Sequence, residues 1–142
     1  MQRRDFLLHG CQACAAMIVL PAIASMESCS GVKSLSYDPP TGSSTINVPV
    51  SVFATGNSAV IVSKAVPDRI WLTKLGDGSY RAMQLRCTHK GGPLHEEAGA
   101  MVCEWHKSHF NNAGQPTSGP AKVALMAYPV KVEGDQLLIE LG

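Results

Sequence analysis

The stretch CTHKGGPLHEEAGAMVCEWHKSHF, residues 87–110, holds a Cys-x-His and, after a gap of thirteen residues, a Cys-x-x-His. Cys87 and His89 follow the strand-like run MQLR, and Cys103 and His106 follow the strand-like run AMV. Turn residues come after each pair, so both pairs are predicted to lie in loops at strand ends. Two such loops side by side would bring two thiols and two imidazoles together, which predicts a metal site.

The choice of metal depends on how cysteine and histidine are distributed over the two loops. Small zinc modules usually carry two cysteines on one arm and two histidines on the other. Here each loop carries one cysteine and one histidine. A two-iron cluster can use this mixture, because the cysteines can bind one iron while the histidines bind the other. The spacing therefore favours an iron–sulfur cluster, and a zinc-binding structural or interaction module with the same ligands is the alternative.

From Ile46 onward the chain alternates short runs of β-forming residues with turns, beginning with the strand-like run INVPVSVF at 46–53, and no long window has a helical stripe. KLGDGSY at 74–80 and VEGDQLL at 132–138 place Gly and Asp between strand-like runs and are predicted hairpins. Residues 108–122 show no strand pattern and are predicted to form a long loop. The pattern predicts an all-β fold, a small antiparallel sandwich or barrel with the two ligand loops at one end.

At the four ligand positions the sequence resembles the Rieske 2Fe-2S family, whose pattern is Cys-x-His followed by Cys-x-x-His. SGPA and YPVKVEGDQLLIEL, further along the chain, resemble the proline loop and closing strands of that family. The resemblance implies one 2Fe-2S cluster per chain, with Cys87 and Cys103 on the buried iron and His89 and His106 on the outer iron. The gap between the two motifs is shorter than is usual in the family, which implies a shortened hairpin.

The same resemblance implies roles for residues around the cluster. Respiratory members carry a second cysteine in each loop, and Gly92 and Trp105 stand at these positions, so no disulfide braces the site. Ser108 matches a serine whose hydroxyl bonds a bridging sulfide, whereas Phe110 stands where high-potential members have a tyrosine. One donor kept and one lost imply an intermediate reduction potential, because hydrogen bonds to sulfur stabilise the reduced state. Trp105 is expected to shield the cluster from water, and Pro120 belongs to the covering proline loop.

An electron-transfer component of an oxidoreductase, rather than a stand-alone catalyst, is the function that the resemblance implies. The sequence contains no nucleophile elbow, phosphate loop or paired catalytic carboxylates. A redox protein, a cytochrome or a molybdenum subunit, is expected to dock at the edge formed by His89 and His106. Lys90 replaces the apolar leucine of respiratory members, which argues against quinol oxidation, and with Arg86 and Lys107 it predicts a positive tip. The alternative is the small subunit of an arsenite-oxidase-like molybdenum enzyme.

Residues 1–29 are predicted to be an export signal or an N-terminal anchor. Arg3 and Arg4 precede an apolar run that is typical of a signal-peptide core. RRDFL resembles the twin-arginine export motif, which implies export of the folded protein. We therefore expect the protein on the periplasmic side of the bacterial inner membrane or in the periplasm, a location that disfavours a cytoplasmic oxygenase ferredoxin.

Beyond the leader, three arrangements remain open: cleavage, lipid anchoring at Cys29, or retention of the leader as an anchor. Residues 30–44 are rich in Ser, Gly and Pro and are predicted to be a flexible tether, followed by the Rieske 2Fe-2S domain at 45–142.

A hydrophobic content of 45% and a charged content of 16% are typical of a globular chain. A formal net charge of +1 argues against a nucleic-acid binder.

Overall fold

The computed structural model describes residues 32–142, and this part of the chain is almost entirely β-structure. None of its helices has the length and hydropathy of a membrane-crossing segment. The elements are β1 (Lys33–Ser36), β2 (Thr45–Pro49), the 3-10 helix η2 (Val50–Thr55), β3 (Ser58–Val62), β4 (Ile70–Lys74), β5 (Tyr80–Gln84), β6 (Leu94–Glu97), β7 (Ala100–Cys103), β8 (His109–Phe110), β9 (Pro116–Ser118), β10 (Ala127–Tyr128), β11 (Val130–Glu133) and β12 (Gln136–Glu140).

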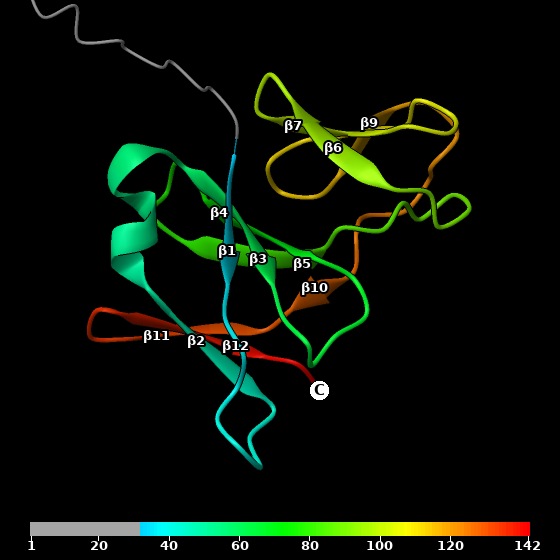
Figure 1. Ribbon diagram of the computed structural model, residues 1–142. Coiled ribbons are helices and arrows are strands. Elements are labelled where there is room, and N and C mark those ends of the chain that lie inside the picture. The colour runs from blue at the N-terminus through cyan, green and yellow to red at the C-terminus, as the bar shows by residue number, and fades with distance from the viewer. Residues whose placement is uncertain (1–31) are drawn as a thin grey trace, which may run out of the picture.

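The strands form three sheets, which Figure 1 shows as successive layers. The central sheet has the order β1-β3-β4-β5-β10, the second has the order β11-β12-β2, and the third has the order β6-β7-β8-β9. Neighbouring strands are antiparallel, apart from the parallel pair β1 and β3. The prediction of an all-β, mainly antiparallel fold is confirmed.

Strand β4 shows why the central sheet can carry a layer on each face. Successive side chains of a strand point to opposite faces. Ile70 and Leu72 lie in one apolar core, shared with β2 and β12, whereas Trp71 lies in the other core, shared with the third sheet. All three are buried. The continuous apolar run of β4 therefore supplies two cores at once, and the second core supports the cysteine-bearing sheet.

Both predicted hairpins form, and the first of them positions a ligand loop. In the first, Gly78 has a φ of +83° and the turn connects Lys74 with its partner Tyr80. In the second, Glu133 pairs with Gln136 around a turn in which Gly134 has a φ of +60°. Because the first hairpin lies at one end of β5, the chain leaves the other end of that strand directly into the loop that begins at Cys87.

Three local predictions were wrong. Residues 33–36 of the predicted tether form β1, because Lys33–Ser36 pairs with Ala59–Val62, while residues 30 and 31 lie outside the described part. The run after Pro49 forms η2 rather than a strand, since tertiary context outweighs the β-propensity of its valines. The predicted loop at 108–122 contains the short strands β8 and β9.

Candidate metal centre

The first ligand loop, residues 87–92, is a closed turn. The N–H of Gly91 donates to the carbonyl of Cys87 at 2.8 Å, and the N–H of Cys87 donates to the carbonyl of Gly92 at 3.0 Å. Gly91 has a φ of +71°, a left-handed conformation that glycine adopts without strain. These bonds fix Cys87 at the start of the loop and turn the chain back toward β6.

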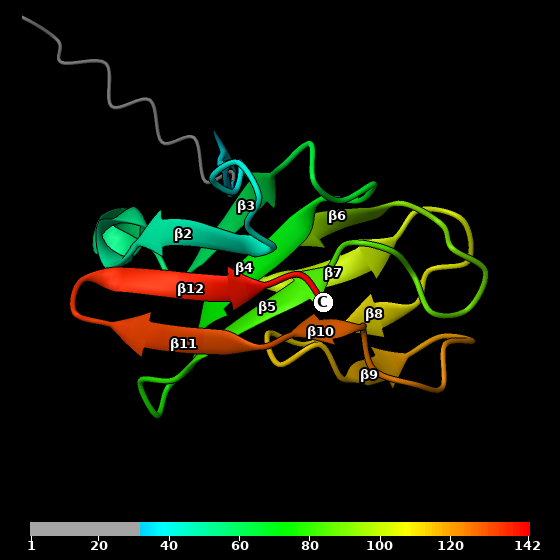
Figure 2. The same ribbon diagram turned by 90° about the horizontal axis from the view of Figure 1, so that it is seen from below.

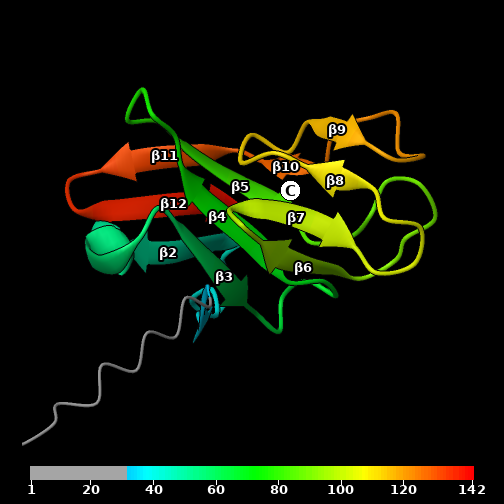
Figure 3. The same ribbon diagram turned by 90° about the horizontal axis from the view of Figure 1, so that it is seen from above.

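The second ligand loop, residues 103–108, repeats this pattern position for position. The N–H of Lys107 donates to the carbonyl of Cys103 at 3.0 Å, and the N–H of Cys103 donates to the carbonyl of Ser108 at 2.8 Å. Lys107, which occupies the position of Gly91, also has a positive φ, +54°. Figures 2 and 3 show both loops at the same end of the molecule, on the right. The sequence prediction of two paired loops is therefore matched by the arrangement of the backbone.

The two cysteines are buried and lie next to each other. Cys87 is 3% exposed and Cys103 is 1% exposed, and both are free thiols. Burial raises the pKa of the Cys87 thiol, and the neighbouring Cys103 raises it further, while the backbone N–H of His89 and the hydroxyl of Ser108 act in the opposite direction. A pair of buried, unbridged thiols is suited to a shared metal, which replaces their protons on binding.

The two histidines form the outer side of the centre. The ring centroids of His89 and His106 are 4.9 Å apart, with the rings edge to face. Partial burial and the charges of His106 and Lys90 lower the pKa of His89, which favours the neutral imidazole that binds metals. Nδ1 of His89 is buried and has no hydrogen-bond partner in the protein. A buried imidazole nitrogen without a partner is what a metal-ligand position leaves when the protein alone is considered.

The four side chains fit a two-iron cluster better than a single ion. They form one buried pair of thiols and one outer pair of imidazoles. This division is the one required by a cluster in which two cysteines bind one iron and two histidines bind the other.

Ser108 connects the second loop to the proline loop. Its side chain is fully buried, and its Oγ accepts a hydrogen bond of 3.1 Å from the N–H of Ala121. The hydroxyl also lies near enough to the Cys87 thiol to lower the pKa of that thiol. Pro120 lies between Ala121 and Gly119, and Gly119 packs so closely that a Cβ there would lie 2.6 Å from Cα of Ser108.

A second bond ties the proline loop to the first ligand loop. Oγ1 of Thr88 donates to the carbonyl of Val123 at 2.8 Å. The proline loop therefore holds both ligand loops, one through Ser108 and the other through Thr88. The sequence did not indicate a role for Thr88. The Ser-Gly-Pro turn indicated the segment that contains Gly119, but not the close packing of that glycine.

Gly92 and Trp105, where a disulfide was expected to be missing, lie against each other. A Cβ on Gly92 would lie 2.9 Å from Cδ2 of Trp105 and 2.9 Å from Sγ of Cys103. Packing of the indole on the glycine thus joins the loops in place of a covalent bond. Trp105 is nevertheless 59% exposed, so it covers only one side of the site. Phe110 is completely buried in the core that contains both cysteines.

Arg86, predicted to add positive charge to the tip, is largely engaged elsewhere. Its Nη1 lies 3.6 Å from Oδ2 of Asp68, which also accepts a hydrogen bond of 2.6 Å from Gln84. A Cβ on Gly91 would lie 3.0 Å from Nε of Arg86. The guanidinium therefore supports the back of the first ligand loop, a contact that the sequence alone did not indicate.

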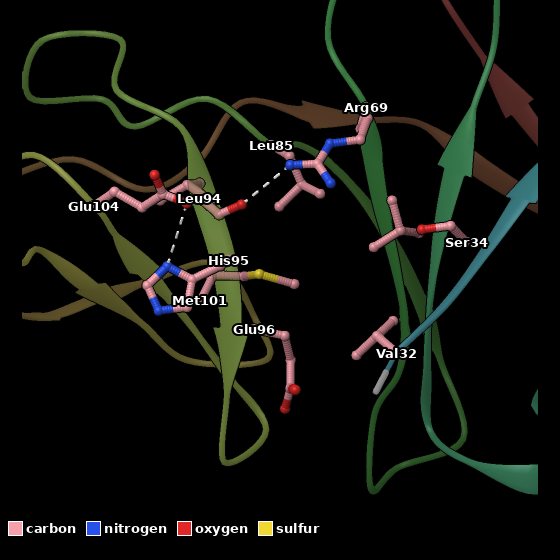
Figure 4. Close-up of a pocket in the computed structure, with 10 residues that line it drawn as sticks. Val32, Ser34, Arg69, Leu85, Leu94, His95, Glu96, Met101 and Glu104 are labelled. Carbon is pink, nitrogen blue, oxygen red and sulfur yellow. Dashed lines mark hydrogen bonds and ion pairs between the residues drawn. The ribbon is translucent and has the colours of Figure 1, made fainter. Parts of the chain in front are cut away.

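The other two described histidines lie outside the ligand loops, on strands: His95 belongs to β6 and His109 to β8. Nδ1 of His95 is 3.8 Å from Oε1 of Glu104, at a cavity of about 320 Å³ between β6 and β1 (Figure 4). Across this cavity Arg69 donates to the carbonyl of Leu94 at 3.3 Å.

The comparison with known families identifies the family to which the chain belongs. The family model of the Rieske [2Fe-2S] domain matches residues 35–129. The chain belongs to the Rieske [2Fe-2S] domain family. A Rieske domain binds one 2Fe-2S cluster. The zinc-binding module that the sequence left as an alternative therefore does not apply.

Three proteins illustrate what the chain is similar to. The chain is 34% identical over 61% of its length to the carotenoid phi-ring synthase of Chlorobaculum tepidum, and 34% identical over 44% to the ferredoxin component of the alkene monooxygenase system of Xanthobacter autotrophicus. It spans 15% and 55% of these relatives. The plasma membrane Rieske protein of Synechocystis PCC 6803 is 26% identical, with a TM-score of 0.53 over 66% of this chain and 96% of that protein. Rieske [2Fe-2S] domains are electron-transfer domains.

Proposed function

We propose that Cys87 and Cys103 bind the buried iron as thiolates, and that His89 and His106 bind the outer iron through imidazole nitrogens. The observation that carries this assignment is the pairing of the His89 and His106 rings, 4.9 Å apart between centroids, with a buried Nδ1 on His89 that has no hydrogen-bond partner. Nδ1 of His95 also has no hydrogen-bond partner, but it faces a carboxylate, with Oε1 of Glu104 at 3.8 Å, and not a second imidazole. The adjacent, buried thiols support the other half. When bound, the cluster supplies a centre that accepts and releases one electron.

The surrounding residues prepare this centre in three ways. Ser108 offers its hydroxyl proton to sulfur, which favours the reduced, more negative state. The proline loop covers the thiol side through its bonds to both ligand loops. His106 is exposed, so the histidine edge is the side at which a partner protein can approach for electron transfer.

Metal content and spectra of the anaerobically purified protein test the assignment. We expect two irons and two sulfides per chain, together with the absorption and electron paramagnetic resonance spectra of mixed Cys/His ligation. Cys87→Ser and His106→Ala should abolish the cluster. His95→Ala and His109→Ala are matched controls, because these histidines lie outside the centre, and they should keep it. A colourless protein containing zinc, or loss of iron in the control variants, would contradict the assignment.

We also propose that the protein is an exported component of a membrane-associated or periplasmic oxidoreductase. The leader, residues 1–29, lies outside the described residues, and the proposal rests on its apolar run and its RRDFL motif. Replacing Arg3 and Arg4 by lysine should leave the protein in the cytoplasm. Cys29→Ser should release it from the membrane fraction if the cysteine is lipidated. Export that continues through the general secretory route after the lysine exchange would reject the twin-arginine route.

The partner remains either a cytochrome or the molybdenum subunit of an arsenite-oxidase-like enzyme in this proposal. A second candidate function is that of an oxygenase ferredoxin, which the 34% identity to the alkene monooxygenase ferredoxin component favours. Co-purification of the tagged protein from its own cells distinguishes them. A molybdenum protein or a cytochrome in the eluate supports the first proposal, and an oxygenase subunit supports the second.

A further inference from the structure

Each of the three segments that build the centre carries one exposed lysine. Lys90 comes from the first ligand loop, Lys107 from the second, and Lys122 from the proline loop. Two large apolar side chains lie exposed in the same segments, Trp105 at 59% and Val123 at 61%. We call these five residues the cluster-end patch.

The charge of the cluster-end patch is not balanced within the described part of the chain. Five ion pairs form among residues 32–142, and none of them includes Lys90, Lys107 or Lys122. The nearest acidic residue in sequence, Glu104, lies beside His95 instead. Three unpaired positive charges at one end of a chain whose net charge is only +1 indicate a local field that attracts carboxylates.

Lys107 is held at a position that suits glycine. Its φ is +54°, and the equivalent residue of the first ligand loop is Gly91, with a φ of +71°. A left-handed conformation is strained for a residue with a Cβ. Strained backbone conformations cluster at functional sites. A lysine kept in such a conformation beside a redox centre therefore indicates a function for its charge.

The two apolar residues are held firmly although their side chains are exposed. The indole of Trp105 rests on Gly92, and the carbonyl of Val123 accepts the bond from Thr88. Little side-chain or loop freedom is lost when a partner covers such residues, which lowers the cost of association. An apolar centre with a charged rim is the usual composition of a protein interface.

We propose that the cluster-end patch docks a redox protein whose cofactor edge is apolar and ringed by carboxylates. The proposal rests on the ligation given above, because the patch residues belong to the two ligand loops and to the loop bonded to both of them. A protein partner fits better than an anionic membrane surface, because electrons must leave through the histidine edge of these same loops and a lipid layer there would block the approach of the acceptor.

Electron transfer to two forms of one acceptor tests the charge requirement. The reduced full-length protein is mixed, in a stopped-flow instrument, with oxidised mitochondrial-type cytochrome c, which has lysines around its haem edge, or with the same cytochrome after succinylation has converted those lysines to carboxylates. At low ionic strength the succinylated form should oxidise the cluster at least about tenfold faster. Added salt should remove the difference. A faster reaction with the native cytochrome, or equal rates, would overturn the proposal.

Single substitutions assign the effect to the patch. Lys90→Glu and Lys122→Glu should each slow the reaction with succinylated cytochrome about threefold or more. Lys74→Glu makes the same charge change beside Tyr80, at the end of β5 away from the ligand loops, and should leave the rate unchanged. Val123→Ser should slow the reaction without changing its salt dependence. Equal slowing by the Lys74 variant would show a general charge effect and reject the patch.

Lys107→Gly separates charge from folding. Removing the strained Cβ should raise the melting temperature, while loss of the lysine should slow the reaction. A lower melting temperature with an unchanged rate would mean that Lys107 has only a structural role.

The cluster spectrum of every variant is recorded first. Absence of a mixed Cys/His cluster in the wild-type protein refutes the ligation, whereas a normal spectrum without acceptor preference refutes only the docking. Salt-sensitive sedimentation with phosphatidylglycerol vesicles that needs the same lysines, without acceptor preference, would assign the patch to a membrane surface.

Discussion

The N–H of Ala121 and the Oγ of Ser108 form a hydrogen bond of 3.1 Å that joins the proline loop to the second ligand loop. By accepting this bond, the buried hydroxyl keeps its own proton for the Cys87 sulfur. One short contact therefore both holds the cover of the cluster and orients a donor toward a candidate ligand.

Ser108→Ala should lower the reduction potential. Loss of this hydrogen-bond donor should destabilise the reduced state by about 1 kcal/mol, which corresponds to about 40 mV for a one-electron centre. Voltammetry of the purified protein measures the midpoint. Ser118→Ala, on the exposed strand β9, is the control and should leave the midpoint unchanged. A Ser108 variant with the wild-type midpoint would show that the hydroxyl does not act on sulfur.

Gly119→Ala should destabilise the cluster-binding region. Gly119 has a φ of +84°, and its added Cβ would lie 2.6 Å from Cα of Ser108 and 2.7 Å from the carbonyl of Lys107. Gly42 has nearly the same φ, +81°, but an added Cβ there meets nothing within 4 Å. Both variants lose about 1–2 kcal/mol to the left-handed conformation, and only Gly119→Ala adds the backbone clash. Thermal unfolding followed by cluster bleaching compares them; equal losses would argue against the close contact.

Gly92→Ala should reduce cluster occupancy, because its methyl group would meet Sγ of Cys103 and the Trp105 ring at 2.9 Å each. Gly56→Ala is a control with open space around the added Cβ. Trp105→Ala in the Gly92→Ala background should restore part of the iron content by removing one of the two obstacles. Iron analysis and absorbance report the result. Full occupancy in the single Gly92 variant would contradict the tight packing between the loops.

Acid should release β1 from the central sheet. Asp38, which follows β1, accepts hydrogen bonds from the N–H of Lys64 at 2.7 Å and from Oγ of Ser63 at 3.1 Å. These bonds hold the pKa of Asp38 below its ordinary value of 3.8. A lowered pKa in the folded state gives stabilisation that is present above pH 3.8 and is lost as the pH falls through the folded pKa.

Amide exchange of Leu35, which is paired with Ile61, measures this release. Protection should fall in acid for the wild-type protein. Asp38→Asn should show weakened protection already at neutral pH and less dependence on pH. Unchanged protection in that variant would remove Asp38 from the account of how β1 is held.

The sequence was most informative where chemistry and turns coincide. The four candidate ligands, the hairpin around Gly78 and the all-β class followed from residue type and spacing, because metal ligation and left-handed turns tolerate few alternatives. The strand β1 was read as a tether because Lys33–Ser36 lacks an apolar alternation, and it forms only through pairing with β3. The support of Gly91 by Arg86 depends on contacts between segments that no spacing rule reveals.

The equivalence of the two ligand loops has a consequence for how such a site can change. Residues 87–92 and 103–108 share one backbone shape, and the histidine occupies the third position in one and the fourth in the other. The two loops therefore have the same backbone pattern, and the two sides of the centre differ only in their side chains. Exchange of a histidine for a cysteine should therefore change the chemistry of the proposed metal site with little change in the loop backbone, so single substitutions could retune this centre.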